Sequence, residues 1–234
     1  MSSPVPIVHP HYRDRPKQFA RDDFWRQVCR TVDGRPVDEG QIQLIVAAVM
    51  DGLELQADDV LLDLACGNGA LGSHLYPIGV ELLGVDYSEH LISIADEYFS
   101  EPPRRRFVCQ DVAGYTAAEP HPERFTKALC YGSFAYLTRD DALSTLQALS
   151  ERFPGVSRVF LGNVPDRLQV EAFYRGAVPD PAVLEDPLSA IGIWRSEQEF
   201  AVLAERAGWR AEFRRMPAGY YAAHYRYDVV LLRP

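Results

Sequence analysis

The chain has 234 residues, 47% of them hydrophobic, and a formal net charge of -9. That length suits one sizeable domain with at most a small appendage. The acidic charge disfavours nucleic acid and anionic membranes as partners, because phosphate binding depends on clustered Lys and Arg side chains.

The first 36 residues (1–36) predict an N-terminal arm with a cap helix. The arm opens on a polar, proline-containing segment without the apolar run of a signal peptide. Apolar residues recur at helical spacing over residues 20–32, which predicts the cap helix. No stretch approaches the roughly 18 apolar residues that span a bilayer. We therefore expect a cytoplasmic protein with no membrane partner.

The four cysteines of the chain are widely separated. They form no Cys-x-x-Cys pair and no cluster with histidine, so the sequence predicts neither a metal site nor a disulfide framework. Thiols in a reducing cytoplasm are the simpler interpretation.

Residues 37–234 predict an α/β domain, because strand-like and helix-like segments alternate along them. Strands are predicted over residues 60–66, 81–86, 107–110, 125–131, 158–162, 209–215 and 225–232. The last two strands have no helix between them, which is typical of an antiparallel edge. The expected fold is Rossmann-like: a seven-stranded, mostly parallel sheet with an antiparallel C-terminal strand and helices on both faces.

Three segments of this domain have distinctive ends or breaks. Residues 176–194 contain three prolines and two glycines and predict a lid-like insertion. Ser88 is a predicted N-cap of a helix. Ser196 and Glu199 have the spacing of a capping box, which predicts a helix that ends near residue 207.

The segment LLDLACGNGALG, residues 61–72, ends a predicted strand with a Gly-x-Gly-x-x-Gly turn. Such a turn lets the backbone approach a ligand at the N-terminus of the next helix. Dinucleotide cofactors use this geometry, but the glycines alone do not define the ligand.

Three aspartates at the ends of successive predicted strands narrow the choice of ligand. Asp63 precedes the glycine turn and suits a cationic amine, and Asp86 can accept hydrogen bonds from ribose hydroxyls. Asp111 can receive an adenine amine beside the backbone of Val112. An aspartate at a strand end also caps helices, which is the structural alternative for each one. Together they favour a nucleoside that carries an amino acid over a diphosphate.

At these residues the sequence resembles the class I S-adenosylmethionine-dependent methyltransferases. LLDLACGNG resembles their first motif, with Ala65 where a glycine is usual, and GVDYSEHLI, CQDV and ALCYGSFAYL resemble the segments after the next three strands. The resemblance covers roughly residues 37–232 and implies S-adenosylmethionine as cofactor. The implied cofactor-binding residues are Asp63, Ala65, Gly67, Gly69, Asp86, Tyr87, Asp111, Val112 and Cys130.

The resemblance implies transfer of the sulfonium methyl group to a nucleophile by in-line displacement. Acceptor contacts are expected from segments beyond the sheet edge, namely Trp25, Arg30, Tyr131, Ser133, Phe134 and Asn163. Tyr136, Asp166 and His224 are the candidate catalytic residues. Each has a structural alternative: packing for Tyr136, helix capping for Asp166 and exposure at a strand start for His224.

The expected acceptor is a small molecule, such as a secondary metabolite, a sugar or an amino-acid derivative. The Asn/Asp-Pro-Pro-aromatic motif of base-amine methylation is absent from the sequence. The sequence leaves open oxygen against nitrogen as acceptor atom, and a monomer against a homodimer. A non-catalytic S-adenosylmethionine-binding module and a protein methyltransferase are the alternative functions.

Overall fold

The structure of the chain is a computed structural model that describes residues 10–234, apart from the side chains of residues 10 and 11. The predicted N-terminal arm begins at residue 1, so its first nine residues lie outside the described residues. The described part of the arm contains α1 (Pro10–Asp14), η1 (Arg15–Gln18), α2 (Phe24–Gln27) and a hairpin of β1 (Thr31–Val32) and β2 (Arg35–Pro36).

The cap helix predicted over residues 20–32 is wrong in extent, because α2 is a single turn. Cys29 follows α2 with a φ of 54°, in the left-handed region where a right-handed helix cannot continue. The chain then enters the β1–β2 hairpin. The apolar spacing reflects packing against the domain, since Val28 lies over the glycine turn at Gly67.

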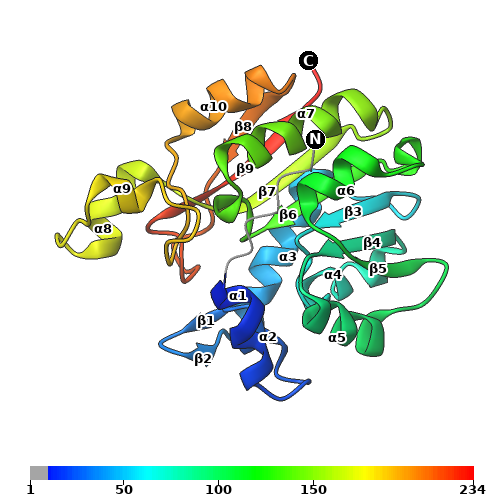
Figure 1. Ribbon diagram of the computed structural model, residues 1–234, viewed down its shortest axis with the longest axis horizontal. Coiled ribbons are helices and arrows are strands. Elements are labelled where there is room, and N and C mark those ends of the chain that lie inside the picture. Colours follow the sequence, from blue (N-terminus) through cyan, green and yellow to red (C-terminus); the bar gives the residue numbers. More distant parts are fainter. Residues whose placement is uncertain (1–9) are drawn as a thin grey trace, which may run out of the picture.

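Seven strands form the main sheet in the order β5-β4-β3-β6-β7-β9-β8 (Figure 1). They are β3 (Val60–Leu64), β4 (Glu81–Asp86), β5 (Arg105–Cys109), β6 (Lys127–Tyr131), β7 (Arg158–Pro165), β8 (Arg210–Arg214) and β9 (Arg226–Leu232). The first five pair in parallel, and β9 runs antiparallel to both β7 and β8. The predicted sheet with its antiparallel C-terminal strand is confirmed.

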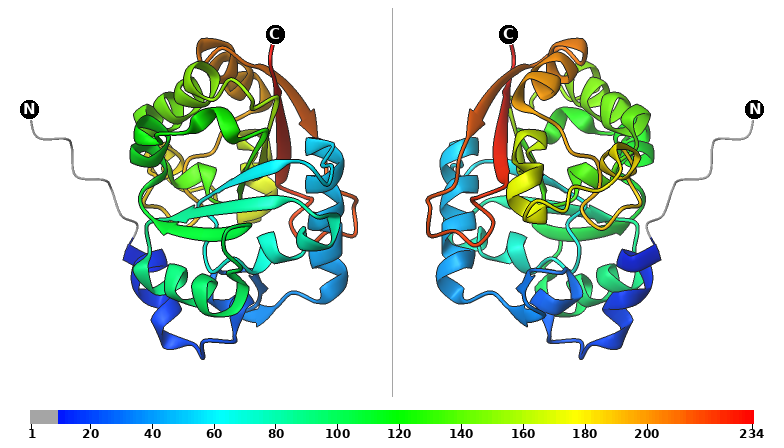
Figure 2. Two further views of the ribbon diagram at one scale, coloured as in Figure 1. Left: turned by 90° about the vertical axis from the view of Figure 1, so that its right-hand side faces the viewer. Right: turned by 90° about the vertical axis from the view of Figure 1, so that its left-hand side faces the viewer.

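Helices cover both faces of the sheet, as predicted (Figure 2). The α-helices of the domain are α3 (Glu39–Leu53), α4 (Ala70–Ser73), α5 (Glu89–Phe99), α6 (Val112–Ala118), α7 (Arg139–Arg152), α8 (Val170–Tyr174), α9 (Pro181–Leu184) and α10 (Glu197–Arg206). Short 3-10 turns are η2 (Tyr76–Ile78), η3 (Pro122–Arg124), η4 (Phe134–Tyr136) and η5 (Arg167–Gln169). Among the described residues, no helix is both long and apolar enough to cross a bilayer.

The alternation of side chains along each strand produces two cores, one on each face of the sheet. In β3, Leu61 joins the core that contains Ile45 of α3 and Ile92 of α5. Its neighbour Leu62 joins the opposite core, which contains Leu146 of α7. Both faces of the sheet are therefore buried. A ligand-binding site can form only at an edge of the sheet, such as the one where the parallel strands end.

The predicted helix starts at Ser88 and Ser196 are confirmed. Ser88 Oγ accepts a hydrogen bond from Leu91 N at 3.3 Å and opens α5. Ser196 Oγ accepts from Glu199 N at 3.2 Å, and the Glu199 carboxylate accepts from Ser196 N at 2.7 Å, which completes the capping box of α10.

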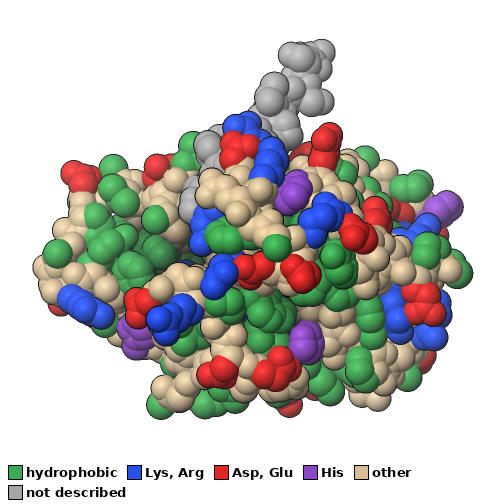
Figure 3. Space-filling model, turned by 90° about the horizontal axis from the view of Figure 1, so that it is seen from below, with side chains coloured by type: hydrophobic (Ala, Val, Ile, Leu, Met, Phe, Trp, Pro, Cys, Tyr) green, Lys and Arg blue, Asp and Glu red, His purple; other side chains and the backbone are tan. Residues whose placement is uncertain are grey.

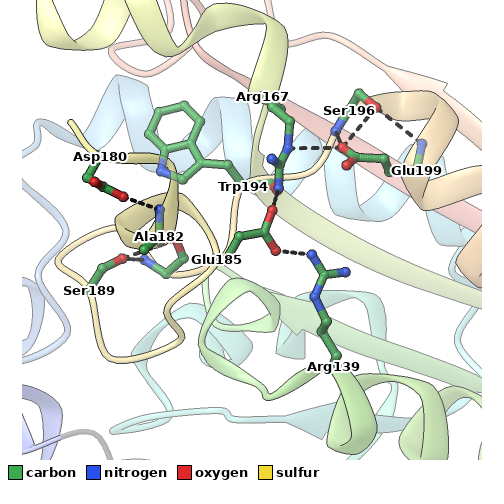
Figure 4. A network of polar contacts seen from close by, with 10 residues as sticks. Arg139, Arg167, Asp180, Ala182, Glu185, Ser189, Trp194, Ser196 and Glu199 are labelled. Carbon is green, nitrogen blue, oxygen red and sulfur yellow. Dashed lines mark hydrogen bonds and ion pairs between the residues drawn. The ribbon is translucent and has the colours of Figure 1, made fainter. Parts of the chain in front are cut away.

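Residues 176–194 are more ordered than the predicted loop, since they contain the one-turn helix α9. Glu185 pairs with Arg139 of α7 and with Arg167 of η5 (Figure 4). Leu184 and Trp194 are buried in a small apolar cluster with Val170 of α8. These contacts hold the insertion against the domain at its middle and at its C-terminal end.

Candidate functional site

A cavity of about 1040 Å³ runs along the sheet edge where the parallel strands end. Asp63, Asp86 and Tyr131 line it from the ends of β3, β4 and β6. Since β9 is antiparallel to β7, its first residue, Arg226, pairs with Pro165 and reaches the same edge. Residues at the ends of β4, β3 and β6 and at the start of β9 therefore form one continuous wall of the cavity.

The two ends of this cavity differ in chemistry. The acidic half, named for Asp63, Asp86 and Asp111, lies beyond β3, β4 and β5. The aromatic half lies beyond β6, β7 and β9 and is formed by Tyr12, Tyr136, Phe173, Tyr221 and Tyr225, together with Arg226. On the outer face shown in Figure 3, acidic and basic side chains are mixed, without a field of one sign.

The glycine turn of the acidic half is held by Asp86. One of its carboxylate oxygens accepts from Gly67 N and the other from Ser88 N, both at 2.9 Å. Gly67 has a φ of 59°, and a Cβ there would lie 2.9 Å from Val28 Cγ1. Both backbone conformation and close packing therefore require glycine at this position.

Ala65 also has a positive φ, 56°, in the left-handed region that favours glycine. A side chain in this conformation costs roughly 1–2 kcal/mol. The strain explains physically why a glycine is usual here in the resembling family.

Asp63 and Asp86 are buried acids with raised pKa values. Burial, followed by the negative charge of Asp86, raises the pKa of Asp63 to about 7, against the opposing effect of Arg30. Burial raises the pKa of Asp86 to about 6, although the Ser88 and Gly67 amides lower it. Two buried carboxyls with pKa values near neutrality can interact with a cation or with hydrogen-bond donors of a ligand.

Asp111 is the N-cap of α6, and its Oδ1 accepts from Gly114 N at 2.7 Å. The capping alternative is therefore correct for this residue. Asp111 and Val112 also line the cavity. A role at the adenine stays a prediction.

The aromatic half combines segments that are far apart in the chain. Tyr12 of α1 donates a hydrogen bond to the Tyr136 hydroxyl at 2.7 Å, and Tyr136 donates to the carbonyl of Ala190 at 3.0 Å. The Phe173 and Tyr225 ring centroids are 4.5 Å apart. The N-terminal arm, η4, α8, the insertion and the segment before β9 therefore close one end of the cavity.

Two buried arginines line the cavity. The Arg30 guanidinium lies 4.8 Å from the Tyr131 ring centroid, and its Nε and Nη1 have no hydrogen-bond partner among the described residues. Arg226 Nη1 donates to the carbonyl of Asn163, while its Nε has no partner within the same part of the chain. Both leave donors available in the site.

The structure brings most of the predicted site residues to the cavity wall. These are Trp25, Arg30, Asp63, Ala65, Gly67, Asp86, Tyr87, Asp111, Val112, Tyr131, Ser133, Tyr136 and Asn163. Asn163 reaches the wall because β7 is irregular between Leu161 and Val164, and its φ is 66°.

Five predicted site residues lie away from the wall. Gly69 is the N-cap of α4 against Phe107, and Cys130 is buried in the core. Phe134 packs on Phe200 behind η4. The placement of these three therefore differs from the prediction.

Two of the candidate catalytic residues are also outside the cavity lining. Asp166 accepts from Leu168 N at 3.0 Å and pairs with Arg215 at 2.6 Å, so its capping alternative is correct. His224 is exposed, with its ring against Tyr225. Of the three candidates, Tyr136 alone lines the described cavity.

Several residues that line the cavity were not predicted from the sequence. They are Tyr12, Cys29, Asn68, Phe173, Tyr221, Tyr225 and Arg226, among others. The one sequence signal for Arg226 is a charged residue at the start of a strand that ends in the apolar run of residues 229–232. Within residues 10–234, no cluster of three or more His, Cys, Asp or Glu side chains is suited to a metal ion.

Comparison with known proteins agrees with this geometry. Residues 61–152 match a family model described as a methyltransferase domain. The chain is 31% identical over 90 residues to a putative methyltransferase, YqeM, of Bacillus subtilis, which is 38% of this chain and 36% of that protein. It is 26% identical over 115 residues to a ubiquinone biosynthesis O-methyltransferase of Leptothrix cholodnii, 49% of this chain and 46% of that one. The chain thus spans less than half the length of the curated relatives it matches.

Among solved structures, magnesium protoporphyrin IX methyltransferase from Synechocystis with bound S-adenosylhomocysteine has a TM-score of 0.65 at 17% identity, covering 97% of this chain and 98% of that one. A 1,6-didemethyltoxoflavin-N1-methyltransferase from Burkholderia thailandensis has a TM-score of 0.58 at 20% identity, covering 99% and 93%. At these identities the likeness shows the fold.

Fold and site define a Rossmann-like domain whose sheet ends in an antiparallel strand and whose parallel strands end at one cavity. The match over the glycine turn and the segments that follow it supports a class I S-adenosylmethionine-dependent methyltransferase. The cofactor of this family is S-adenosylmethionine.

Proposed function

We propose that the chain transfers the methyl group of S-adenosylmethionine to an oxygen or nitrogen of a small molecule by in-line displacement. The observation that carries this proposal is the single continuous cavity of about 1040 Å³ with two chemically different halves. Ligand pockets usually measure roughly 300–1,000 Å³, so this volume suits a cofactor and a small acceptor together. The proposed acceptor is a secondary metabolite, a sugar or an amino-acid derivative.

In this proposal the acidic half binds the cofactor. Asp86 accepts from the ribose hydroxyls, while Asp111 and the backbone of Val112 contact the adenine. Asp63 faces the cationic amine of the amino-acid portion, which lies against the glycine turn with Ala65 and Gly67. Burial of both carboxyls supports this assignment, because a bound cation restores their charged forms.

The aromatic half would bind the acceptor. Tyr131, Ser133 and Asn163 supply the nearer wall, and the Tyr12–Tyr136–Ala190 hydrogen-bond chain closes the far end. Methyl transfer from an activated sulfonium depends strongly on the placement of the acceptor, about 3 Å from the methyl carbon. Exclusion of water by these rings serves that placement.

Tyr136 is proposed to position the acceptor rather than to remove its proton. Burial raises the pKa of Tyr136 above its usual value, so the hydroxyl stays protonated at neutral pH. Its hydrogen bonds to Tyr12 and Ala190 fix the direction of that hydroxyl. It therefore acts as an oriented neutral group beside the acceptor.

The proposed domain division keeps residues 1–36 as an arm and residues 37–234 as the catalytic domain, with residues 176–194 as its lid. Contacts of Tyr12 and Ile191 with the cavity support roles for both the arm and the lid in covering the acceptor. A cytoplasmic monomer or homodimer without a nucleic-acid partner is the expected assembly.

Calorimetric titration with S-adenosylhomocysteine, with NADH as the parallel control, tests the cofactor assignment. Micromolar affinity for S-adenosylhomocysteine alone is expected. Radiolabelled S-adenosylmethionine with panels of phenols, amines and hydroxy acids then tests transfer. Binding of NADH, or of neither compound, would contradict the proposed function, and cofactor binding without transfer would favour a binding module.

A further inference from the structure

We propose that the methyl acceptor is a planar, ring-containing acid whose anionic group is bound by Arg226. This inference rests on the proposed methyl transfer and narrows its acceptor class. It is carried by the environment of one buried guanidinium in the aromatic half of the cavity.

Arg226 is buried, with 8% of its surface exposed, and it lines the cavity at the start of β9. Its Nη1 donates to the Asn163 carbonyl, and its Nε has no hydrogen-bond partner within residues 10–234. The neutral carbonyl oxygen of Asn163 offsets only part of the cost of burying the positive charge of Arg226. A buried charge requires an opposite charge or a full set of hydrogen bonds.

Arg226 forms no ion pair within the described part of the chain, and residues 1–11 contain no Asp or Glu. Asp228, two residues along β9, is the acidic side chain of this strand. Its Oδ1 accepts from Asn163 N at 2.6 Å, and burial raises its pKa to about 6. The Tyr225, Tyr136 and Tyr221 side chains act on Arg226, Tyr225 also through a hydrogen bond, and the positive charge of Arg226 in turn lowers the pKa of Asp228. Asp228 does not line the cavity, and the nearest lining carboxylates along the chain from Tyr136, those of Asp140 and Asp141, form no ion pair with Arg226 within the described residues.

The same wall consists of flat rings. Tyr12 and Tyr136 have centroids 4.8 Å apart, Phe173 and Tyr225 have centroids 4.5 Å apart, and the Arg226 guanidinium lies 4.7 Å from the Tyr225 centroid. Aromatic walls bind planar ligands by stacking and edge contacts. A guanidinium among them binds a carboxylate or a similar anion through two parallel hydrogen bonds.

A neutral sugar fits this half poorly, because it would bury Arg226 without an opposite charge. The Oδ1 atom of Asn163, also buried and without a partner among the described residues, adds a hydrogen-bond acceptor for a ring hydroxyl or amine. An aromatic acid with such a substituent satisfies both groups. The anion serves as the anchor, and the methyl group goes to a different atom of the ring system.

The test uses the chain saturated with S-adenosylhomocysteine and pairs of probes that differ only in charge. Benzoate, 2-naphthoate and indole-3-carboxylate are each compared with the corresponding carboxamide, by thermal shift and then by calorimetry. At least one acid is expected to bind at least tenfold more tightly than its amide. Equal response within every pair, including no response at all, overturns the inference.

Variants separate this inference from the proposed function. Arg226→Gln should remove the preference for acids and leave the affinity for S-adenosylhomocysteine within about twofold, while Arg226→Lys keeps part of the preference. Arg206→Gln, an exposed residue of α10, is the matched control and should change neither. Loss of cofactor affinity in a folded Arg226→Gln or Arg226→Lys chain would instead assign Arg226 to the cofactor and overturn the inference. Failure of the wild-type chain to bind S-adenosylhomocysteine would contradict the proposed function itself.

Discussion

The acidic and aromatic halves of the cavity share one sheet edge but are assembled in different ways. Asp63, Asp86 and Asp111 each end or follow a strand and come from one stretch of about fifty residues. The aromatic half takes Tyr12 from the arm and Arg226 from the last strand. The position of the acidic half is therefore set by the sheet, whereas that of the aromatic half depends on how distant segments pack over the sheet edge. Substitutions in the acidic half should therefore change cofactor binding, and those in the aromatic half should change methyl transfer.

The largest expected effect follows from Asp86→Ala. The loss of an acceptor for the ribose hydroxyls, and for Gly67 N and Ser88 N, should weaken binding of S-adenosylhomocysteine by about 1–3 kcal/mol, roughly 5- to 150-fold. Calorimetry measures this. Asp58→Ala, an exposed aspartate before β3, is the control. Unchanged affinity in Asp86→Ala would remove the ribose assignment.

Asp63 should make cofactor affinity depend on pH. Its pKa is about 7, so the carboxylate that faces the cofactor amine is lost as pH falls through 7. Affinity for S-adenosylhomocysteine should fall by about tenfold from pH 8 to pH 6. Asp63→Asn should remove most of this dependence and leave the weaker one of Asp86, whose pKa is about 6. A tenfold dependence that persists in the variant contradicts the role given to Asp63.

The raised pKa of Asp63 also predicts how the stability of the ligand-free chain depends on pH. The unfolded chain releases the Asp63 proton near pH 4, and the folded chain does so near pH 7. The folded state therefore binds more protons in this window, and this group makes the chain less stable as pH rises from 4 to 7. Urea unfolding of wild type and Asp63→Asn across this range measures the difference.

Tyr136→Phe tests the aromatic half alone. It removes the hydroxyl that accepts from Tyr12 and donates to Ala190, so the cover over the acceptor loosens. Methyl transfer should slow by about 3- to 10-fold, the effect of a lost neutral hydrogen bond, with cofactor affinity unchanged. Tyr98→Phe, on the exposed side of α5, is the matched control. A loss of cofactor affinity would contradict the division of the cavity.

The smallest effect is expected from Ala65→Gly. Glycine relieves the positive φ of 56°, which should stabilise the fold by about 1 kcal/mol after the entropy of the unfolded chain is counted. Thermal unfolding should show a rise of roughly 2–4 °C. A glycine at Ala117, inside α6, should instead destabilise the chain, and destabilisation by both changes would contradict the strain at Ala65.

The sequence predicted the acidic half well because its determinants are local. Periodicity located β3 and β4, and the parallel order of neighbouring strands brought Asp63 and Asp86 to one edge. Phe134 shows the limit of such reasoning. Its neighbours Ser133 and Tyr136 line the cavity, but the Phe134 side chain points away from it and packs on Phe200.

The aromatic half was less accessible to prediction. Arg226 reaches the cavity only because β9 returns antiparallel beside β7, in a register set by the irregularity after Leu161. His224, two residues earlier, was a candidate catalytic residue because histidine titrates near neutral pH, but its side chain is exposed outside the cavity. The contact of Tyr12 with Tyr136 joins residues 124 positions apart, and no local pattern encodes it.

The most direct test of the two-part cavity is a crystal structure of the chain with S-adenosylhomocysteine. The account predicts that the ribose hydroxyls lie within about 3.2 Å of the Asp86 carboxylate and that the cofactor makes no contact with Arg226. A cofactor whose carboxylate binds Arg226, or whose adenine lies between Tyr136 and Tyr225, would contradict it.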